Sequence, residues 1–423
     1  MKIETFLDVD VVALETDDEV SLMLELTAPT TTPDQDRTPA TLVVALDRSG
    51  SMAGQRLWVA QRALCTLVDR LDPTDRFGLV TFDDEASVVV PAGPVLDKDA
   101  LKAAILEVEP GGMTDLSAGY LRGLQEARRA GGDTSRLLLI SDGHANVGVT
   151  DPDVLAGVAA KAATDGVVTT TLGLGLGYDE HLLGAMARSG NGGELFAEEP
   201  DQAAAVIAAE VEGLLTQAIT AASLLIRPSF DVAGVRVIND LPSNAVPGGI
   251  LVELGAFLSG ETRKVVLTFA VPGIAALGVA EVATLELRYV ALPELVEETV
   301  TLPVTVNVVP GSQAAGRVPD PAVRTELVYQ RAQSAKRAAS HHLRDGDVTG
   351  AANTLREALA DLTDSYEAAP PAFAADLHEE MMMLTGLIEE TTDGSTSRAS
   401  KTMMSDAAHK SRTHGRMRRG ERD

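Results

Sequence analysis

The chain has 423 residues, more than a single ordinary hydrophobic core accommodates, so its length predicts about two to four domains. Its formal net charge of −27 argues against binding to nucleic acid or to an anionic membrane surface. Hydrophobic residues make up 45% of the chain but aromatic residues only 3%, so the cores must be built from Val, Leu, Ile and Ala, which suits buried parallel strands.

The amino terminus lacks the basic segment followed by an apolar segment that is typical of a secretory signal peptide. No run of about 18 apolar residues predicts a membrane span. Cys65 is the only cysteine, so no intrachain disulfide can form. These features predict an intracellular protein, with the cytoplasm as its location.

Residues 1–39 begin with apolar segments that predict two strands within 1–28. A stretch rich in Thr, Pro and Asp at 29–39 then predicts a linker or a long loop. Because these strands have no sheet of their own to complete, we expect residues 1–39 to join a β-sandwich formed further along the chain.

Residues 40–218 alternate apolar strands with amphipathic helices. Residues 41–47 form a continuous apolar run that ends in a carboxylate, as expected of a buried parallel strand, and residues 136–141 form another. This alternation predicts an α/β domain of the doubly wound, Rossmann-like type, with a mostly parallel sheet covered by helices on both faces.

The rest of the chain changes pattern twice. Residues 219–312 contain five or six further segments with strand character, which predict the main part of the β-sandwich, so that the α/β domain is inserted in it. Residues 320–390 predict a helical hairpin or a three-helix bundle.

Residues 391–423 are polar, and 398–423 carry eight basic and three acidic residues, a net charge of +5 that leaves −32 for the rest of the chain. This composition predicts a disordered basic tail.

Besides a merely solvated terminus, other interpretations of this tail are open. It could dock on an acidic surface, or its hydroxyl groups could accept phosphate, which an Arg-bearing partner would recognise. Nucleic-acid binding is disfavoured by the acidity of the preceding residues. The candidate phosphate acceptors are Ser395, Thr396, Ser397, Ser400, Thr402, Ser405, Ser411 and Thr413.

Three short motifs place oxygen-bearing side chains just after strands or before helices of the α/β domain. LDRSGS carries Asp47, Ser49 and Ser51, GGMTDL carries Thr114, and LISDG carries Asp142. Because the carboxyl ends of parallel strands meet in one crevice, we expect these five side chains to converge. Two carboxylates with neutral hydroxyls suit Mg²⁺, with Mn²⁺ or Ca²⁺ as alternatives. Such a shell leaves the ion electrophilic, so an Asp or Glu of a partner protein can complete its coordination.

These motifs resemble the metal-ion-dependent adhesion site, or MIDAS, of the von Willebrand factor A family. The DxSxS sequence spans 47–51, Thr114 and Asp142 match the fourth and fifth positions, and no motif position departs from the family pattern. The resemblance covers about 40–218. More loosely, the succession of split sandwich, A domain and carboxyl-terminal helices resembles bacterial proteins similar to inter-alpha-trypsin inhibitor heavy chains. The resemblance to the A domain and its metal site implies a metal-dependent protein–protein interaction module rather than an enzyme.

His144 and Asn146 follow Asp142 closely, and we expect them at the rim of the metal site, in contact with a partner. A different interpretation is a metal-dependent hydrolase with Ser49 or Ser51 as nucleophile and His144 as base. Serines committed to a metal and the lack of a GxSxG motif argue against it. A further alternative, by family resemblance, is a subunit of a multiprotein machine that partners an AAA+ ATPase.

Other motifs have plainer interpretations. The glycines of TLGLGLG lack the spacing of a dinucleotide-binding fingerprint, no P-loop motif occurs, and His378 lacks the second histidine of a zinc protease. Residues 83–85 predict a hairpin tip, with a second cation site as the lesser alternative. Residues 381–383, three methionines, predict core packing.

Overall fold

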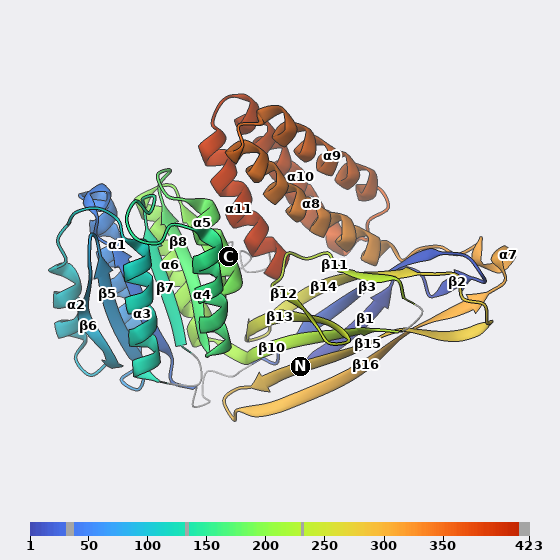
Figure 1. Ribbon diagram of the computed structural model, residues 1–423, viewed down its shortest axis with the longest axis horizontal. Helices are drawn as coiled ribbons and strands as arrows, with labels where there is room; N and C mark the ends of the chain where they lie inside the picture. The colour runs from blue at the N-terminus through green and yellow to red at the C-terminus, as the bar shows by residue number, and fades with distance from the viewer. Residues whose placement is uncertain (31–37, 132–134, 230–231, 414–423) are drawn as a thin grey trace. The chain divides into compact units, whose positions relative to one another are not determined.

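The computed structural model describes residues 1–30, 38–131, 135–229 and 232–413 (Figure 1). The chain divides into two compact units. One consists of residues 32–217, and the other combines 1–31 with 218–423. In the described part of the chain, no helix is long and apolar enough to cross a bilayer.

The first unit is built on a six-stranded sheet in the order β6-β5-β4-β7-β8-β9. Its strands are β4 (Thr41–Asp47), β5 (Arg76–Phe82), β6 (Ala86–Pro94), β7 (Ser135–Ser141), β8 (Val167–Leu174) and β9 (Asn191–Ala197). Only the edge strand β6 is antiparallel to its neighbour, and it forms a hairpin with β5. Every residue of the central strand β4 is buried, as its apolar sequence predicts.

Helices cover both faces of this sheet, which confirms the doubly wound α/β fold (Figure 1). They are α1 (Gln55–Arg70), α2 (Lys98–Leu106), α3 (Leu116–Ala130), α4 (Pro152–Thr164), α5 (Glu180–Ser189) and α6 (Pro200–Leu215). The alternation of side chains along β4 explains the two layers, because Leu42, Val44 and Leu46 pack with α1, whereas Val43 and Ala45 pack with α3.

The second unit contains a β-sandwich that the α/β unit interrupts in the chain. One sheet has the order β1-β3-β14-β11 and the other β12-β13-β10-β15-β16-β2. The strands are β1 (Lys2–Leu7), β2 (Val11–Ala13), β3 (Asp18–Thr27), β10 (Gln217–Pro228), β11 (Gly234–Val237), β12 (Ser243–Val246), β13 (Gly249–Leu258), β14 (Thr262–Val271), β15 (Gly278–Ala291) and β16 (Val296–Val309). Residues 1–28 thus form three strands rather than the predicted two, because β2 leaves the first sheet and pairs with β16 in the second.

Helices follow the sandwich in the same unit: α7 (Gly311–Ala314), α8 (Pro321–Arg344), α9 (Val348–Tyr366), α10 (Pro371–Thr392) and α11 (Thr396–Thr413). Of the three methionines at 381–383, Met382 is exposed, and its neighbours Met381 and Met383 are partly buried against the helical core. The prediction of core packing is therefore wrong for Met382.

The prediction of a disordered tail is wrong for residues 396–413, which form α11. Ala399, Met403 and Ala407 recur at a spacing of four residues and are buried, so the segment has an apolar helix face that its overall composition conceals. Ser400 and Ser411 are buried as well, which removes two of the candidate phosphate acceptors from the surface. The final ten residues of the predicted tail, 414–423, lie outside the described residues.

The basic residues of α11 take part in a buried ionic cluster. Lys336 of α8 forms ion pairs with Glu380 of α10 and, at 2.5 Å, with Asp406 of α11. The Nζ atom of Lys410 lies 2.7 Å from Oε2 of Glu380 and 3.2 Å from Oδ2 of Asp406. Two lysines and two carboxylates thus neutralise one another between three helices, which explains how charged residues of the supposed tail are buried.

Candidate metal site

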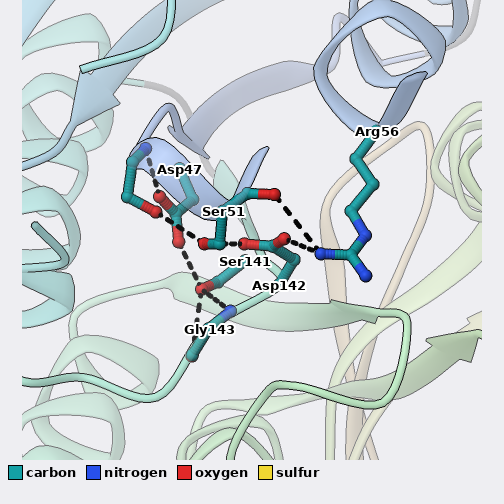
Figure 2. Close-up of polar contacts among 7 residues, drawn as sticks. Asp47, Ser51, Arg56, Ser141, Asp142 and Gly143 are labelled. Atoms are coloured by element: carbon teal, nitrogen blue, oxygen red, sulfur yellow. Dashed lines mark hydrogen bonds and ion pairs between the residues drawn. The ribbon is translucent and has the colours of Figure 1, made fainter. Parts of the chain in front are cut away.

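Asp47 lies at the carboxyl end of β4 and is completely buried. Its Oδ1 accepts a hydrogen bond from the backbone N–H of Ser49 at 2.8 Å, and its Oδ2 accepts one from the hydroxyl of Ser141 at 2.6 Å (Figure 2). Sequence reasoning missed Ser141. It is the last residue of the neighbouring parallel strand β7, so the strand register carries a signal that could have identified it.

The two serines of the first motif connect Asp47 to Asp142. The hydroxyl oxygens of Ser49 and Ser51 lie 3.1 Å apart, and the hydroxyl of Ser51 donates to Oδ1 of Asp142 at 2.7 Å (Figure 2). Asp142 directly follows β7 and is buried. The predicted convergence of the first and third motifs at the carboxyl edge of the sheet is therefore present in the structure.

Thr114 joins the group from the loop before α3. A Cβ added to Gly143 would lie 3.4 Å from the hydroxyl of Ser51 and 3.5 Å from that of Thr114, so both hydroxyls adjoin Gly143. The loops of Ser51 and Thr114 are also bonded directly, because the N–H of Gly50 donates to the carbonyl of Gly112 at 2.9 Å. All five predicted ligands thus belong to one group of loops.

Residues 83–85 form the tip of the β5–β6 hairpin and brace the Thr114 loop. Asp83 pairs with Arg48 at 2.8 Å, and Asp84 accepts a hydrogen bond from the N–H of Met113 at 2.9 Å. Gly111 and Gly112 permit this approach, since a Cβ at either position would lie within about 2 Å of one of these carboxylates. The geometry supports a bracing role for both acids and gives no support to a second cation site.

The two predicted rim residues differ in what they contact. His144 has an exposed side chain whose Nδ1 lies 3.9 Å from the carboxylate of Asp179. Asn146 is also exposed, but its side-chain oxygen accepts a hydrogen bond from the backbone N–H of Thr114 at 3.0 Å. Asn146 therefore positions a candidate metal ligand, whereas His144 presents its ring at the surface.

Arg56 is a second residue that sequence reasoning missed. It lies in the first turn of α1, and its Nη1 is 2.5 Å from Oδ2 of Asp142 and 3.3 Å from the carbonyl oxygen of Ser51 (Figure 2). The available signal was a basic residue five positions after Ser51, at the start of the helix that follows the motif. The direction in which the Arg56 side chain points depends on the fold of the loop before α1, and the sequence pattern does not specify that fold.

The electrostatics favour a cation at this site. Burial raises the pKa of Asp47, and the nearby charge of Asp142 raises it further, while hydrogen bonds from Ser141 and Ser49 act in the opposite direction. Asp47 and Asp142 are both buried, and Arg56 pairs with only one of them. Isolated buried carboxylates are costly, so a divalent cation beside Asp47 would offset that cost.

The donor set fits a hard cation. It consists of two carboxylates and three hydroxyls, all oxygen donors, as Mg²⁺, Mn²⁺ and Ca²⁺ prefer. Among the described residues, no group of three or more His, Cys, Asp or Glu side chains is arranged to hold a metal ion. The hydroxyl-rich set around Asp47 is a different kind of site, in which carboxylates are a minority of the ligands.

A cleft of about 490 Å³ opens beside the candidate metal site. It is lined by Ser51, Ala53, Gln55, Arg56, Gly175, Leu176, Glu198 and Glu199. The wall of the cleft therefore includes one candidate metal ligand, Ser51, and also Arg56, which pairs with the candidate ligand Asp142. A molecule bound at the metal site can extend into this cleft.

The comparison with known families identifies the α/β unit. Residues 41–209 match the model of the von Willebrand factor type A domain. The chain is 33% identical over 172 residues to the uncharacterized protein sll0103 of Synechocystis sp., a match that covers 40% of each. It is 29% identical over 167 residues to human inter-alpha-trypsin inhibitor heavy chain H4, a match that covers 37% of this chain and 18% of that protein.

Two solved structures resemble most of the chain. A von Willebrand factor type A protein from Catenulispora acidiphila gives a TM-score of 0.72 at 15% identity, over 89% of this chain and 88% of that one. The ArnB paralog VWA2 from Sulfolobus acidocaldarius gives a TM-score of 0.64 at 17% identity, over 96% of this chain and 98% of that one. At these identities the likeness establishes a shared fold beyond the α/β unit alone.

Proposed function

We propose, on the premise that residues 41–209 form a von Willebrand factor type A domain, that this domain binds one divalent cation and, through it, an acidic side chain of a partner protein. The proposed ligands are Asp47, Ser49, Ser51, Thr114 and Asp142. We propose Mg²⁺ as the ion, because it is commonly held by one or two carboxylates and keeps several waters. A partner carboxylate would replace one of those waters.

One observation carries this proposal: two buried carboxylates, Asp47 and Asp142, are joined at the carboxyl edge of the sheet by a chain of contacts through the backbone N–H and hydroxyl of Ser49 and the hydroxyl of Ser51. In open α/β sheets this edge is where ligands bind. Neutral hydroxyls leave most of the ion's charge uncompensated, which favours an anionic ligand from outside the domain.

The same contacts give no support to hydrolysis by Ser51. Its hydroxyl donates to Asp142, and the nearest described ionic partner of His144 is Asp179. Nucleophilic catalysis needs a base within hydrogen-bonding reach of the nucleophile. We therefore propose a binding role, and we propose the cytoplasm as its location, since Cys65 is a buried free thiol.

The test is a Mg²⁺ titration by calorimetry followed by affinity capture from cytosol of the native organism. The wild-type protein should bind one Mg²⁺ and retain a partner that chelator releases, whereas Asp47→Ala should do neither. Asp99→Ala, on the exposed surface of α2, is the matched control and should behave as wild type. Capture that is unchanged by chelator and by Asp47→Ala would contradict the proposal.

A further inference from the structure

Exposed apolar side chains are concentrated at one edge of the α/β unit. Among its described residues, eight large hydrophobic side chains are exposed, and six of these lie in loops at the carboxyl edge of the sheet or in the helical turns next to those loops. The six are Trp58, Leu106, Met113, Val149, Val154 and Leu176. Single exposed hydrophobic residues are common on protein surfaces, but their concentration at the edge that carries the metal site indicates a binding surface there.

Trp58 is the only tryptophan of the chain, and 54% of its surface is exposed. It is the fourth residue of α1, and its N–H donates to the carbonyl of Gly54 at 3.2 Å, so it belongs to the first helical turn after the DxSxS loop. The guanidinium of Arg62 lies 5.4 Å from the centre of the indole, a cation–π contact that orients the ring. Because helical side chains lean toward the amino terminus of their helix, we expect the indole to extend toward the loop of Ser51.

Met113 and Val149 belong to two loops that are bonded to each other around Thr114. Met113 directly precedes Thr114 and is 55% exposed. Val149 is also exposed, and its N–H donates to the hydroxyl of Ser117 at 3.0 Å, while the N–H of Val147 in the same loop donates to the carbonyl of Thr114 at 3.3 Å. The backbones are therefore fixed while the apolar side chains face solvent, so a partner would lose little free energy in ordering them.

Leu176 adds an exposed apolar side chain from the loop after β8, where it lines the cleft together with Ser51. Trp58, Met113, Val149 and Leu176 are referred to below as the apolar surface. Each comes from a different segment at the carboxyl edge of the sheet.

The cation and the apolar surface favour different groups of a partner. The cation attracts one carboxylate, and water weakens that attraction because it raises the effective dielectric constant. Apolar side chains of a partner that pack beside the carboxylate would exclude this water. Tryptophan and methionine are enriched in protein interfaces, and tryptophan is among the residues whose truncation most often weakens binding strongly.

We propose that the apolar surface binds bulky apolar residues that flank the acidic residue of the partner, with Trp58 as the main contact. The inference rests on the proposed function and adds the kind of partner segment that the site recognises. The occupant is a segment of another protein in which one Asp or Glu is adjacent to residues such as Leu, Ile or Phe. Charge complementarity with the cation places the acidic residue, and the apolar surface then selects its neighbours.

The experiment selects peptides in Mg²⁺ from a displayed library that has one fixed glutamate, random flanking positions and no tryptophan. Wild-type protein should enrich large apolar residues beside the glutamate. Since Trp58 is the only tryptophan of the protein, its emission should shift to shorter wavelength when a selected peptide is added, and chelator should reverse the shift. Trp58→Ser should weaken binding of that peptide about ten- to a hundredfold by calorimetry, and Met113→Ser about three- to tenfold.

Matched variants guard against indirect effects. Leu96→Ser removes a side chain that is 81% exposed and follows β6 at the opposite edge of the sheet, so it should leave peptide binding unchanged. Trp58→Phe keeps an aromatic ring and should lose less affinity than Trp58→Ser. Circular dichroism and Mg²⁺ affinity should be those of wild type for each variant, and Trp58→Ser alone decides the test if Met113→Ser binds Mg²⁺ more weakly.

The outcomes separate this inference from the proposed function. Mg²⁺-dependent acidic peptides with no apolar preference, or with affinity that Trp58→Ser does not alter, would overturn the inference and leave the proposed function standing. Emission of Trp58 that shifts with protein concentration in the absence of peptide would show that a second copy of the chain covers the apolar surface, which would also overturn the inference. Absence of any Mg²⁺-dependent binding would overturn both.

Discussion

The guanidinium of Arg56 lies 2.5 Å from the carboxylate of Asp142, whereas Asp47, the other buried acid of the site, is stabilised by hydrogen bonds from Ser49 and Ser141. One carboxylate thus already has a fixed positive charge beside it. Arg56 orients Asp142, but its charge also repels any cation bound by the same group.

Arg56→Gln should therefore tighten Mg²⁺ binding. About 1 kcal/mol of repulsion remains between unit charges a few ångströms apart even in a water-like dielectric, so we expect about a three- to tenfold lower dissociation constant by calorimetry. Arg62→Gln, one to two turns further along α1 and exposed, should have no effect. Weaker binding by Arg56→Gln would show that orientation of Asp142 outweighs the repulsion.

The raised pKa of Asp47 predicts a pH-dependent response to Mg²⁺. In the metal-free protein a raised folded-state pKa favours folding at low pH, and this stability is lost as pH rises through that pKa. Mg²⁺ binds only the ionised form, so the Mg²⁺-induced rise in melting temperature should be present at pH 7 and lost as pH falls toward 4.

Thermal melts with Mg²⁺ and with chelator between pH 4 and pH 7.5 measure this response. Asp47→Asn removes the buried charge, so it should show no Mg²⁺-induced shift at any of these pH values. A wild-type shift of the same size at both ends of the range would contradict the account.

Asn146 and His144 should separate metal binding from partner binding. Asn146→Ala removes the hydrogen bond to the N–H of Thr114, worth about 1 kcal/mol, and should weaken Mg²⁺ binding about fivefold in a calorimetric titration. His144→Ala should leave Mg²⁺ affinity unchanged and lower only retention of the captured partner. Equal loss of Mg²⁺ affinity in both variants would show that His144 supports the metal site.

The ionic cluster of the helical region gives a prediction about stability. Burial opposes ionisation of Asp406, but Lys336 and Lys410 outweigh it and lower its pKa to about 2. Lys336→Met leaves Glu380 and Asp406 to share Lys410, so we expect a loss of about 3–5 kcal/mol in urea unfolding.

Lys161→Met is the control for that measurement, because its pair with Asp165 is exposed and should contribute less than about 1 kcal/mol. Because the pKa of Asp406 is depressed, its contribution to stability should persist above about pH 4 and be lost between about pH 4 and pH 2. A change of less than 1 kcal/mol for Lys336→Met would show that the cluster does not stabilise the helices.

The sequence predicts much of this architecture because the relevant patterns are local. Asp47 and Asp142 follow continuous apolar strands, so their place at the carboxyl edge of a parallel sheet follows from periodicity and topology alone. Their motifs also specify Ser49, Ser51 and Thr114 by spacing. The family match and the related folds agree with the domain type that these motifs imply.

What the sequence did not predict depends on contacts between distant segments. Ser141 bonds Asp47 through strand register, and Arg56 reaches Asp142 only because the loop before α1 directs it there. The error over α11 has another cause: the average composition of the segment is dominated by its charge, whereas Lys410 is neutralised in the fold by Glu380 of α10 and by Asp406 one turn earlier in α11.

The most direct test of the central claim is anomalous diffraction from a crystal of the protein grown with Mn²⁺, an ion that the same oxygen ligands accept. The account predicts one anomalous peak within coordination distance of Asp47, Ser49, Ser51, Thr114 or Asp142, including at least one of the two carboxylates. A well-ordered crystal with these side chains visible and no manganese between them would contradict it.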